Sequence, residues 1–135
     1  MDVERLIEEA MKAREMAYAP YSEFRVGAAL LDGDGTIYSG CNIENASYGA
    51  CNCAERTAIF KAVSEGAGDF RAIAIVGGKD KAVTEFCPPC GICRQVLQEF
   101  GTKELRVIVA KSTEDYKEYG FEELLPFGFG GESIR

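Results

Sequence analysis

The sequence predicts an α/β fold in which a mixed, about five-stranded sheet lies between helices, a three-layer α/β/α arrangement. Segments with helical hydrophobic spacing alternate with short strand-like segments along the chain, as is typical of α/β proteins. Residues 72–76 are continuously apolar, as expected for a strand that is covered on both faces. The length of 135 residues, with 47% hydrophobic and 27% charged residues, predicts a single globular domain over residues 1–135.

The first part of the chain predicts a helix followed by a β-hairpin. Apolar residues at helical spacing indicate an amphipathic helix over residues 2–18, with Asp2 as its N-cap and Pro20 just beyond its end. Residues 24–31 and 36–43 are predicted strands. The Asp-Gly-Asp-Gly sequence at 32–35 predicts the hairpin turn that connects them.

The rest of the chain predicts two more helices and two more strands. Residues 54–65 are expected to form a helix that Gly66 ends, and residues 72–76 the apolar strand. A third helix is expected over residues 91–100, with Gly101 behind it, and a fourth strand over 105–110. The pattern around 115–120 is too weak to decide whether a fifth strand follows. This order of elements implies a mixed sheet with helices on both faces.

Composition and charge exclude several classes of protein. The net charge of −7 disfavours a polyanionic partner such as a nucleic acid. No apolar run approaches the roughly 20 residues that a membrane-spanning helix needs. The acidic start of the chain lacks the pattern of a signal peptide. We therefore expect a cytoplasmic protein with no nucleic-acid or membrane partner, whose cysteines are reduced thiols rather than a disulfide framework.

The chain contains six cysteines and no histidine. Because histidine is the usual general acid and base near neutral pH, hydrolytic chemistry here would depend on carboxylates, thiolates or a metal. Cys53 stands two residues before Glu55, and the sequence Pro-Cys-Gly-Ile-Cys at 89–93 contains Cys90 and Cys93. This combination resembles the all-cysteine form of the signature of zinc-dependent deaminases.

These residues are predicted to converge on one zinc ion per chain. Cys53 lies at the start of the second predicted helix. Cys90 and Cys93 lie three residues apart at the start of the third, where they can share one face. The partial positive charge of helix amino termini favours thiolates there. Three thiolates leave one position of tetrahedral zinc open, which is typical of a catalytic site. Glu55 is then placed to move the protons of a water molecule that zinc activates.

The other cysteines leave a second interpretation open. Free cysteine is commonly a small buried residue, and this is the expectation for Cys41, Cys51 and Cys87. However, Cys51 could also join the three predicted ligands in a four-cysteine structural zinc site. In that case Glu55 would be a solvated helix residue, and the protein a non-enzymatic zinc module.

Five segments carry a resemblance to a known family. They are Tyr-Ala-Pro-Tyr-Ser at 18–22, Phe-Arg-Val-Gly-Ala-Ala-Leu at 24–30, Gly-Cys-Asn-Ile-Glu-Asn at 40–45, Cys-Ala-Glu-Arg at 53–56 and Pro-Cys-Gly-Ile-Cys-Arg-Gln at 89–95. Over nearly its whole length the chain resembles the small, homotetrameric bacterial cytidine deaminases, whose motifs occur in the same order. The resemblance implies a five-stranded mixed sheet between helices and a zinc cofactor. The implied reaction, part of pyrimidine salvage, hydrolyses the 4-amino group of cytidine or 2′-deoxycytidine to give uridine or 2′-deoxyuridine and ammonia.

The resemblance also implies roles for individual residues. Phe24 would line the pocket against the pyrimidine, and the main chain of Ala54 would contact the base edge. Asn42 and Glu44 would bind the ribose hydroxyls, which is reasonable because alternate residues of a strand face the same side. Taken without the resemblance, Asn42 and Glu44 would be ordinary solvated residues and Phe24 a core residue.

Two arginines and a phenylalanine match further family positions. Arg56 is expected to donate hydrogen bonds to the ligand thiolates and so to offset the net negative charge of three thiolates on Zn²⁺. Arg94 is expected to have a structural role or to form a salt bridge. Phe129 matches a tail phenylalanine that the family's tetramers place over the substrate of a neighbouring subunit. We therefore expect a homotetramer with shared active sites and a small-molecule nucleoside as substrate.

Other functions stay open on the sequence alone. A deaminase of another aminated base or nucleoside would share the zinc and Glu55 but would need different sugar contacts. An RNA- or DNA-editing deaminase is disfavoured by the acidic charge of the chain. A non-enzymatic zinc module would need no open coordination position.

Overall fold

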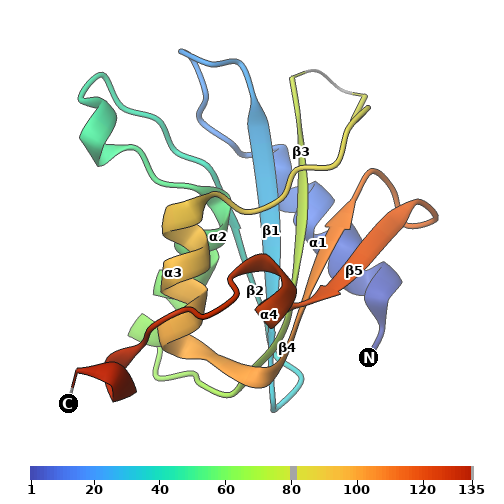
Figure 1. Ribbon diagram of the computed structural model, residues 1–135. Helices are drawn as coiled ribbons and strands as arrows, with labels where there is room; N and C mark the ends of the chain where they lie inside the picture. Colours follow the sequence, from blue (N-terminus) through green and yellow to red (C-terminus); the bar gives the residue numbers. More distant parts are fainter. Residues whose placement is uncertain (80–81, 135) are drawn as a thin grey trace.

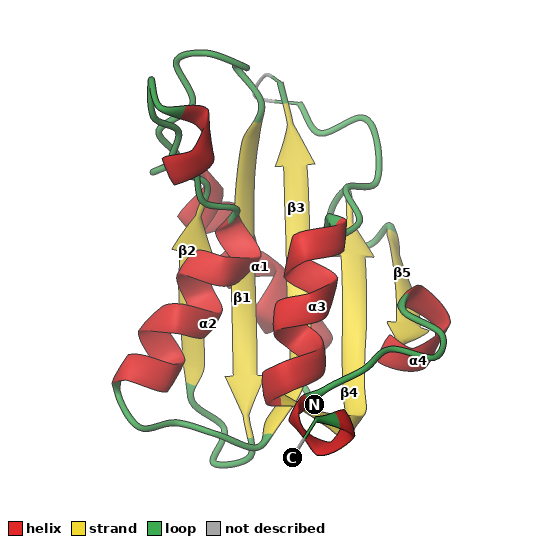
Figure 2. Ribbon diagram, turned by 60° about the vertical axis from the view of Figure 1, so that its left-hand side comes forward, coloured by secondary structure: helices red, strands yellow, loops and turns green. Residues whose placement is uncertain are grey.

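The computed structural model describes residues 1–79 and 82–134 and shows a three-layer α/β/α fold. A five-stranded sheet carries α1 on one face and α2 and α3 on the other (Figure 1 and Figure 2). The elements are α1 (Val3–Arg14), β1 (Arg25–Asp32), β2 (Ile37–Cys41), η1 (Tyr48–Ala50), α2 (Ala54–Ser64), β3 (Phe70–Gly78), α3 (Gly91–Phe100), β4 (Gly101–Ala110), β5 (Tyr116–Gly120), α4 (Phe121–Leu124) and η2 (Gly131–Ser133), where η marks a short 3-10 helix. The predicted fold class is confirmed.

The sheet is mixed, with the strand order β2-β1-β3-β4-β5. β1 pairs antiparallel with both β2 and β3, β3 pairs parallel with β4, and β4 pairs antiparallel with β5. Because parallel neighbours need a crossover connection, α3 carries the chain from the end of β3 back to the start of β4. The segment that the sequence left undecided forms β5, at one edge of the sheet.

Burial on both faces of the sheet explains the continuous apolar run in β3. Ile73 and Ile75 are fully buried in a core that they share with α2 and α3. Ala72, Ala74 and Val76 are fully buried in a second core, which includes the apolar face of α1. Because alternate residues of a strand point to opposite sides, this one strand supplies both cores.

Helix α1 ends earlier than the sequence predicted. Its start is as expected, since the Asp2 side chain accepts a hydrogen bond from the Arg5 main-chain N–H at 3.0 Å. It ends at Arg14 rather than near residue 18. The Tyr18 N–H donates instead to the Asn42 carbonyl at 3.0 Å, so this part of the chain pairs with the segment that follows β2. The hydrophobic pattern therefore overstated the helix by about one turn.

The other predicted boundaries differ from the structure by a few residues. Helix α3 covers the predicted range 91–100, and α2 ends just before Gly66, whose φ of 85° suits a residue that follows a helix. Strand β2 is shorter than the predicted range 36–43. β3 and β4 extend beyond the predicted ranges 72–76 and 105–110, because the apolar patterns detect only the parts of these strands that are most deeply buried.

Helices α2 and α3 lie side by side and begin at the same end of the sheet (Figure 1 and Figure 2). Helix α2 lies close to β2, since a β-carbon on Gly40 would lie 2.5 Å from the Ala58 nitrogen and 2.9 Å from the Ala54 carbonyl oxygen. Glycine at position 40 therefore permits this approach. The two loops that lead into α2 and α3 meet at the end of the sheet where these helices start, and together they line one cavity.

Replacing Gly27 with alanine is expected to destabilise the fold. A β-carbon at Gly27 would lie 1.9 Å from the Ala10 carbonyl oxygen and 2.5 Å from the Arg14 nitrogen, so α1 would have to move away from β1. We expect Gly27→Ala to lower the free energy of unfolding by about 2–3 kcal/mol, measured by urea denaturation. Gly49→Ala is the matched control, because a β-carbon there meets nothing within 4 Å. Equal stability of the two variants would contradict the close packing of α1 on the sheet.

Candidate active site

Three cysteines meet where α2 and α3 begin. Cys53 is the N-cap of α2, Cys90 is the N-cap of α3, and Cys93 lies in the first turn of α3. Their Sγ atoms all lie within 4.8 Å of one another, and those of Cys53 and Cys90 are 3.7 Å apart. Zinc–sulfur bonds of ~2.3 Å in a tetrahedron hold neighbouring sulfur atoms about 3.8 Å apart. The spacing of the three thiols therefore fits a zinc ion.

The local sequence explains why these ligands lie at helix starts. An N-cap residue has an extended main chain, and Cys53 (φ −75°, ψ 155°) and Cys90 (φ −68°, ψ 168°) both have this conformation. Neither side chain caps its own helix with a hydrogen bond, so both sulfur atoms are free to face a shared ion. The partial positive charge of the two helix amino termini favours the thiolate forms that bind metal.

Arg56 adds a full positive charge beside the thiols. Its Nη2 donates a hydrogen bond to the Cys53 Sγ at 3.3 Å. The hydrogen bond from the Cys93 thiol, together with Arg56, lowers the pKa of Cys53 to about 5, whereas the same thiol–thiol hydrogen bond raises the pKa of Cys93. Among the described residues, the buried Nε of Arg56 has no hydrogen-bond partner. The predicted contact between Arg56 and a ligand sulfur is thus present in the structure.

Glu55 is a buried carboxyl group beside this cluster. It is the second residue of α2, and only 4% of its surface is exposed. Burial raises the pKa of Glu55 to about 7, and the negative charge on Cys53 adds to this effect. A carboxyl group with a pKa near 7 can both accept and donate a proton under neutral conditions.

A cavity of about 220 Å³ contains the reactive groups. It brings together the predicted site residues Asn42, Glu44, Cys53, Ala54, Glu55, Arg56 and Cys90. Cys93 does not line it but lies buried next to Cys53 and Cys90. Five further residues also line the cavity: Val26, Cys51, Asn52, Cys87 and Pro88. Among them, Cys51 had been considered from the sequence as a possible fourth zinc ligand. Hydrophobic patterning and motif spacing give no signal that Val26, Asn52 and Pro88 line the cavity, because the fold alone brings the loops together.

Phe24 and Asn42 have positions that the sequence did not anticipate. Phe24 does not line the cavity; it is half-buried and lies against Gly77, close to Cys87. The Asn42 side chain accepts a hydrogen bond from the Val26 N–H at 2.8 Å and donates one to the Phe24 carbonyl at 2.8 Å. Asn42 therefore holds the first residues of β1 in place, besides lining the cavity.

Phe129 lies outside the cavity of its own chain. It is 58% exposed, and its carbonyl accepts a hydrogen bond from the Gln95 side chain at 2.9 Å, which attaches the C-terminal segment to α3. Arg94 donates hydrogen bonds to the Pro89 carbonyl at 2.8 Å and to the Leu124 carbonyl at 2.7 Å. These hydrogen bonds give Arg94 a structural role, since it connects the loop before Cys90 to the end of α4.

The remaining cysteines do not join the ligand cluster. Cys51 exchanges hydrogen bonds with the main chain of Asn45, at 3.2 Å and 3.6 Å, and in the described part of the chain the group that fits a metal contains three cysteines without it. The four-cysteine interpretation is therefore wrong. Cys41 was predicted to be buried within a strand, but it ends β2 and is only half-buried. Cys87 is also half-buried, and burial, followed by the negative charge of Glu55, raises its pKa to about 12.

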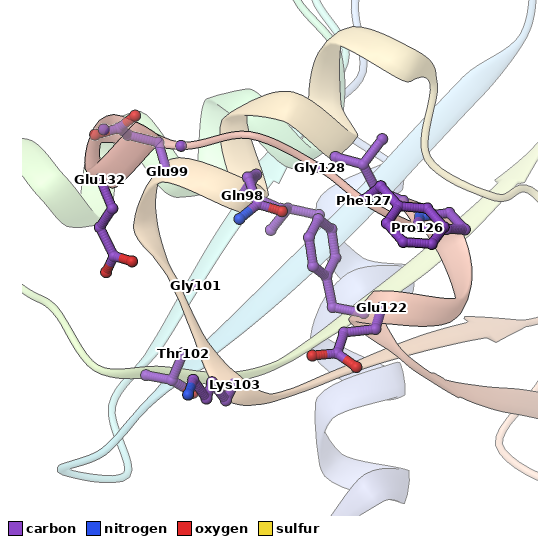
Figure 3. Close-up of a pocket in the computed structure, with 15 residues that line it drawn as sticks. Gln98, Glu99, Gly101, Thr102, Lys103, Glu122, Pro126, Phe127, Gly128 and Glu132 are labelled. Atoms are coloured by element: carbon purple, nitrogen blue, oxygen red, sulfur yellow. The ribbon is translucent and has the colours of Figure 1, made fainter. Parts of the chain in front are cut away.

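A larger cavity of about 660 Å³ lies elsewhere, between the end of α3, the start of β4 and the C-terminal segment (Figure 3). Its charged lining residues are Glu99, Lys103, Glu122 and Glu132, and neither the ligand cysteines nor Glu55 line it. By size alone, this larger cavity would be chosen as the candidate active site. The smaller cavity is the candidate active site, because it contains the metal-binding thiols and the carboxyl group with a near-neutral pKa.

Three thiols that fit zinc and a buried carboxyl group beside them define a hydrolytic zinc enzyme site on an α/β fold, since three protein ligands would leave one position of the metal for water. Comparison with known families identifies the particular class. The family described as "Cytidine and deoxycytidylate deaminase zinc-binding region" matches residues 1–109. The chain therefore belongs to the cytidine and deoxycytidylate deaminase family, whose matching region binds zinc.

Individual relatives agree with this assignment. The chain is 52% identical over 134 residues to a cytidine deaminase of Sporosarcina psychrophila, with 99% of this chain and 96% of the relative covered. The crystal structure of cytidine deaminase from Burkholderia pseudomallei is similar at a TM-score of 0.84 and 50% identity, covering 93% of this chain and 97% of that chain. That of the Mycobacterium tuberculosis cytidine deaminase gives a TM-score of 0.81 and 40% identity, covering 96% and 98%.

Elemental analysis of purified variants tests the ligand set. We expect about one zinc per chain in the wild type, and loss of zinc when Cys53, Cys90 or Cys93 is replaced by alanine, since each thiol supplies one corner of the tetrahedron. Cys51→Ala and Cys87→Ala are matched controls near the same cavity and should keep the metal. Zinc loss from the Cys51 variant, with zinc retained by the Cys53 variant, would contradict the assignment.

Proposed function

We propose that this protein hydrolyses the 4-amino group of cytidine and 2′-deoxycytidine, which gives uridine or 2′-deoxyuridine and ammonia. The position of Glu55 carries the proposal. A buried carboxyl group with a pKa near 7 lies beside thiols that fit zinc, in a cavity that also contains Asn42 and Glu44. Family membership and 52% identity to a cytidine deaminase support the same substrate class.

Glu55 moves the protons in the proposed reaction. Zinc held by the three thiolates would supply activation of a water molecule for attack on carbon 4 of the cytosine ring. Glu55 accepts a proton from the water and delivers it to ring nitrogen 3. It then accepts the proton of the new hydroxyl on carbon 4 and passes it to the amino group, which leaves as ammonia as the bond from carbon 4 to that nitrogen breaks and the carbonyl forms. The net reaction consumes one water and releases one ammonia. Because a single carboxyl group acts as base and as acid, a pKa near the working pH suits both steps.

Residues at the cavity wall are proposed to hold the nucleoside. Asn42 and Glu44 would bind ribose hydroxyls, and the main chain of Ala54 would contact the edge of the base; all three line the cavity with Glu55. Phe24 would pack against the pyrimidine. Its position close to Cys87, which lines the cavity, supports this proposal.

The proposed setting is pyrimidine salvage in the cytoplasm, with residues 1–135 as one catalytic domain that acts on free nucleosides. The net charge of −7 disfavours a nucleic-acid substrate. No helix in residues 1–79 or 82–134 has the length and apolar character that crossing a membrane requires.

We also propose a homotetramer in which neighbouring subunits share active sites. Phe127 is fully exposed and Phe129 is 58% exposed, and exposed aromatic side chains close together are candidate contact surfaces. Phe129 does not line the cavity of its own chain, which is compatible with a role in the cavity of a neighbour. An aromatic ring over the pyrimidine would help to exclude bulk water from the reaction.

Replacing Glu55 with glutamine tests the proposed mechanism. We expect Glu55→Gln to keep zinc and the fold but to lower kcat for cytidine by more than about 10²-fold, because an amide cannot accept a proton from water. Ammonia release and the loss of cytosine absorbance measure the reaction. Glu65→Gln, an exposed residue at the other end of the same helix, is the control and should leave kcat unchanged. Near-normal turnover of Glu55→Gln would remove Glu55 from the mechanism.

Mixing inactive variants tests whether active sites are shared. Phe129→Ala subunits and Glu55→Gln subunits are each expected to be impaired alone. In hybrid tetramers, some cavities would receive an intact Glu55 from one subunit and an intact Phe129 from its neighbour, so activity should recover. Phe129→Ala subunits exchanged with one another serve as the control and should stay impaired, since no cavity then receives an intact Phe129. No recovery, despite subunit exchange shown by mass spectrometry, would mean that each chain completes its own site.

A further inference from the structure

The carboxylate of Glu44 is held by a short segment that lies outside the cavity. Its Oε1 accepts hydrogen bonds from the main-chain N–H groups of Tyr21 at 3.0 Å and Ser22 at 3.1 Å. Its Oε2 accepts a hydrogen bond from the Ser22 hydroxyl. Glu44 lines the cavity with Glu55, whereas Ser22 does not. The orientation of a cavity residue thus depends on a residue behind it.

These hydrogen bonds leave Glu44 a limited number of acceptor positions. An ionised carboxylate has about four lone-pair positions, two on each oxygen. The two N–H groups occupy those on Oε1, and the Ser22 hydroxyl occupies one on Oε2. One position on Oε2 is left to accept a hydrogen bond from a ligand hydroxyl. The hydrogen bonds from Ser22 also lower the pKa of Glu44, which keeps it an ionised acceptor.

The Ser22 hydroxyl has a fixed direction. Its oxygen accepts a hydrogen bond from the Phe24 main-chain N–H at 3.0 Å, so its own proton is directed to Glu44. The resulting chain of hydrogen bonds runs from Phe24 through Ser22 to Glu44, and such chains polarise one another. It connects the residue proposed to lie against the pyrimidine with a residue proposed to bind the sugar.

The main chain around Ser22 is held in an uncommon conformation. Glu23 has a φ of 60°, in the left-handed region that side-chain-bearing residues rarely adopt. The Glu23 N–H donates to the Ala19 carbonyl at 3.0 Å, and the contacts of Ser22 with Glu44 and Phe24 flank it. Conformations of this kind persist where the surroundings enforce them. The hydrogen bonds between Glu44 and this segment are part of that enforcement.

We infer that Ser22 is a positioning residue that sets the preference for substrates with ribose hydroxyls, by directing one free acceptor position of Glu44 toward the sugar. The inference rests on the proposed function, since it concerns how the same cavity selects nucleosides. Ser22 does not line the cavity, so a base bound there would not contact it. Its removal therefore affects binding of the sugar and leaves the chemistry at the base intact.

Steady-state kinetics with two nucleosides test the inference. Cytidine has both ribose hydroxyls, and 2′,3′-dideoxycytidine has neither. For Ser22→Ala we expect kcat/KM for cytidine to fall about tenfold, chiefly through KM, with less than about twofold change for dideoxycytidine. Ser22→Thr retains the hydroxyl and should keep most of the preference. Ser64→Ala is the control, because its hydroxyl donates only to the Lys61 carbonyl at the end of α2 and it does not line the cavity.

A loss confined to cytidine and restored by Ser22→Thr supports the role of Ser22. Equal losses on both nucleosides in Ser22→Ala, or losses as large in Ser22→Thr as in Ser22→Ala, would overturn it and leave Ser22 a purely structural residue of the turn. No loss in Ser22→Ala would overturn it as well, since the two N–H groups would then suffice to hold Glu44. A wild type that releases ammonia from neither nucleoside would instead refute the proposed function, on which the inference depends.

Discussion

The active site depends on one constraint, which is that α2 and α3 begin at the same end of the sheet, on the same face. Each helix supplies its N-cap as a metal ligand, Cys53 and Cys90, and the two sulfur atoms lie 3.7 Å apart. The approach requires a glycine at position 40 under α2 and the parallel pairing of β3 with β4, which places α3 as a crossover. Two helix amino termini then direct partial positive charge toward the same point. The fold therefore creates the electrostatic conditions that three thiolates need.

The sequence predicted those features that depend on local patterns. Residue spacing predicted the metal ligands at the helix starts. The apolar run predicted β3, because burial on both faces makes each of residues 72–76 apolar. The predicted end of α1 was wrong because Tyr18 pairs with the segment after β2, and this contact joins distant parts of the chain. The fifth strand was left undecided because β5 lies at the sheet edge with most of its residues exposed, so no alternating pattern marks it.

The wall of the candidate site was harder to predict than its ligands. Asn42 uses its amide to hold the main chain on either side of Arg25, a role that depends on β1 and β2 being neighbours in space. Cys87 lines the cavity only because the loop before α3 meets the loop before α2. Phe129 lies along α3 within its own chain, so any part that it plays in catalysis belongs to an assembly rather than to the single chain. Contacts between distant residues leave little trace in a single sequence.

Arg56 and Glu55 show how neighbouring charges are balanced in such a site. Three thiolates on Zn²⁺ would carry a net charge of about −1, which would disfavour formation of a nucleophile from water. The hydrogen bond from Arg56 to Cys53 would offset this charge. Cys53 and Arg56 act on the pKa of Glu55 in opposite directions. The negative charge of Cys53 raises this pKa and the positive charge of Arg56 lowers it, while burial has a larger effect than either charge. An arginine that lay closer to Glu55 would keep it ionised and unable to donate a proton. Because the guanidinium of Arg56 instead donates to the Cys53 sulfur, it stabilises the thiolate and still leaves Glu55 able to act as both base and acid, as proposed.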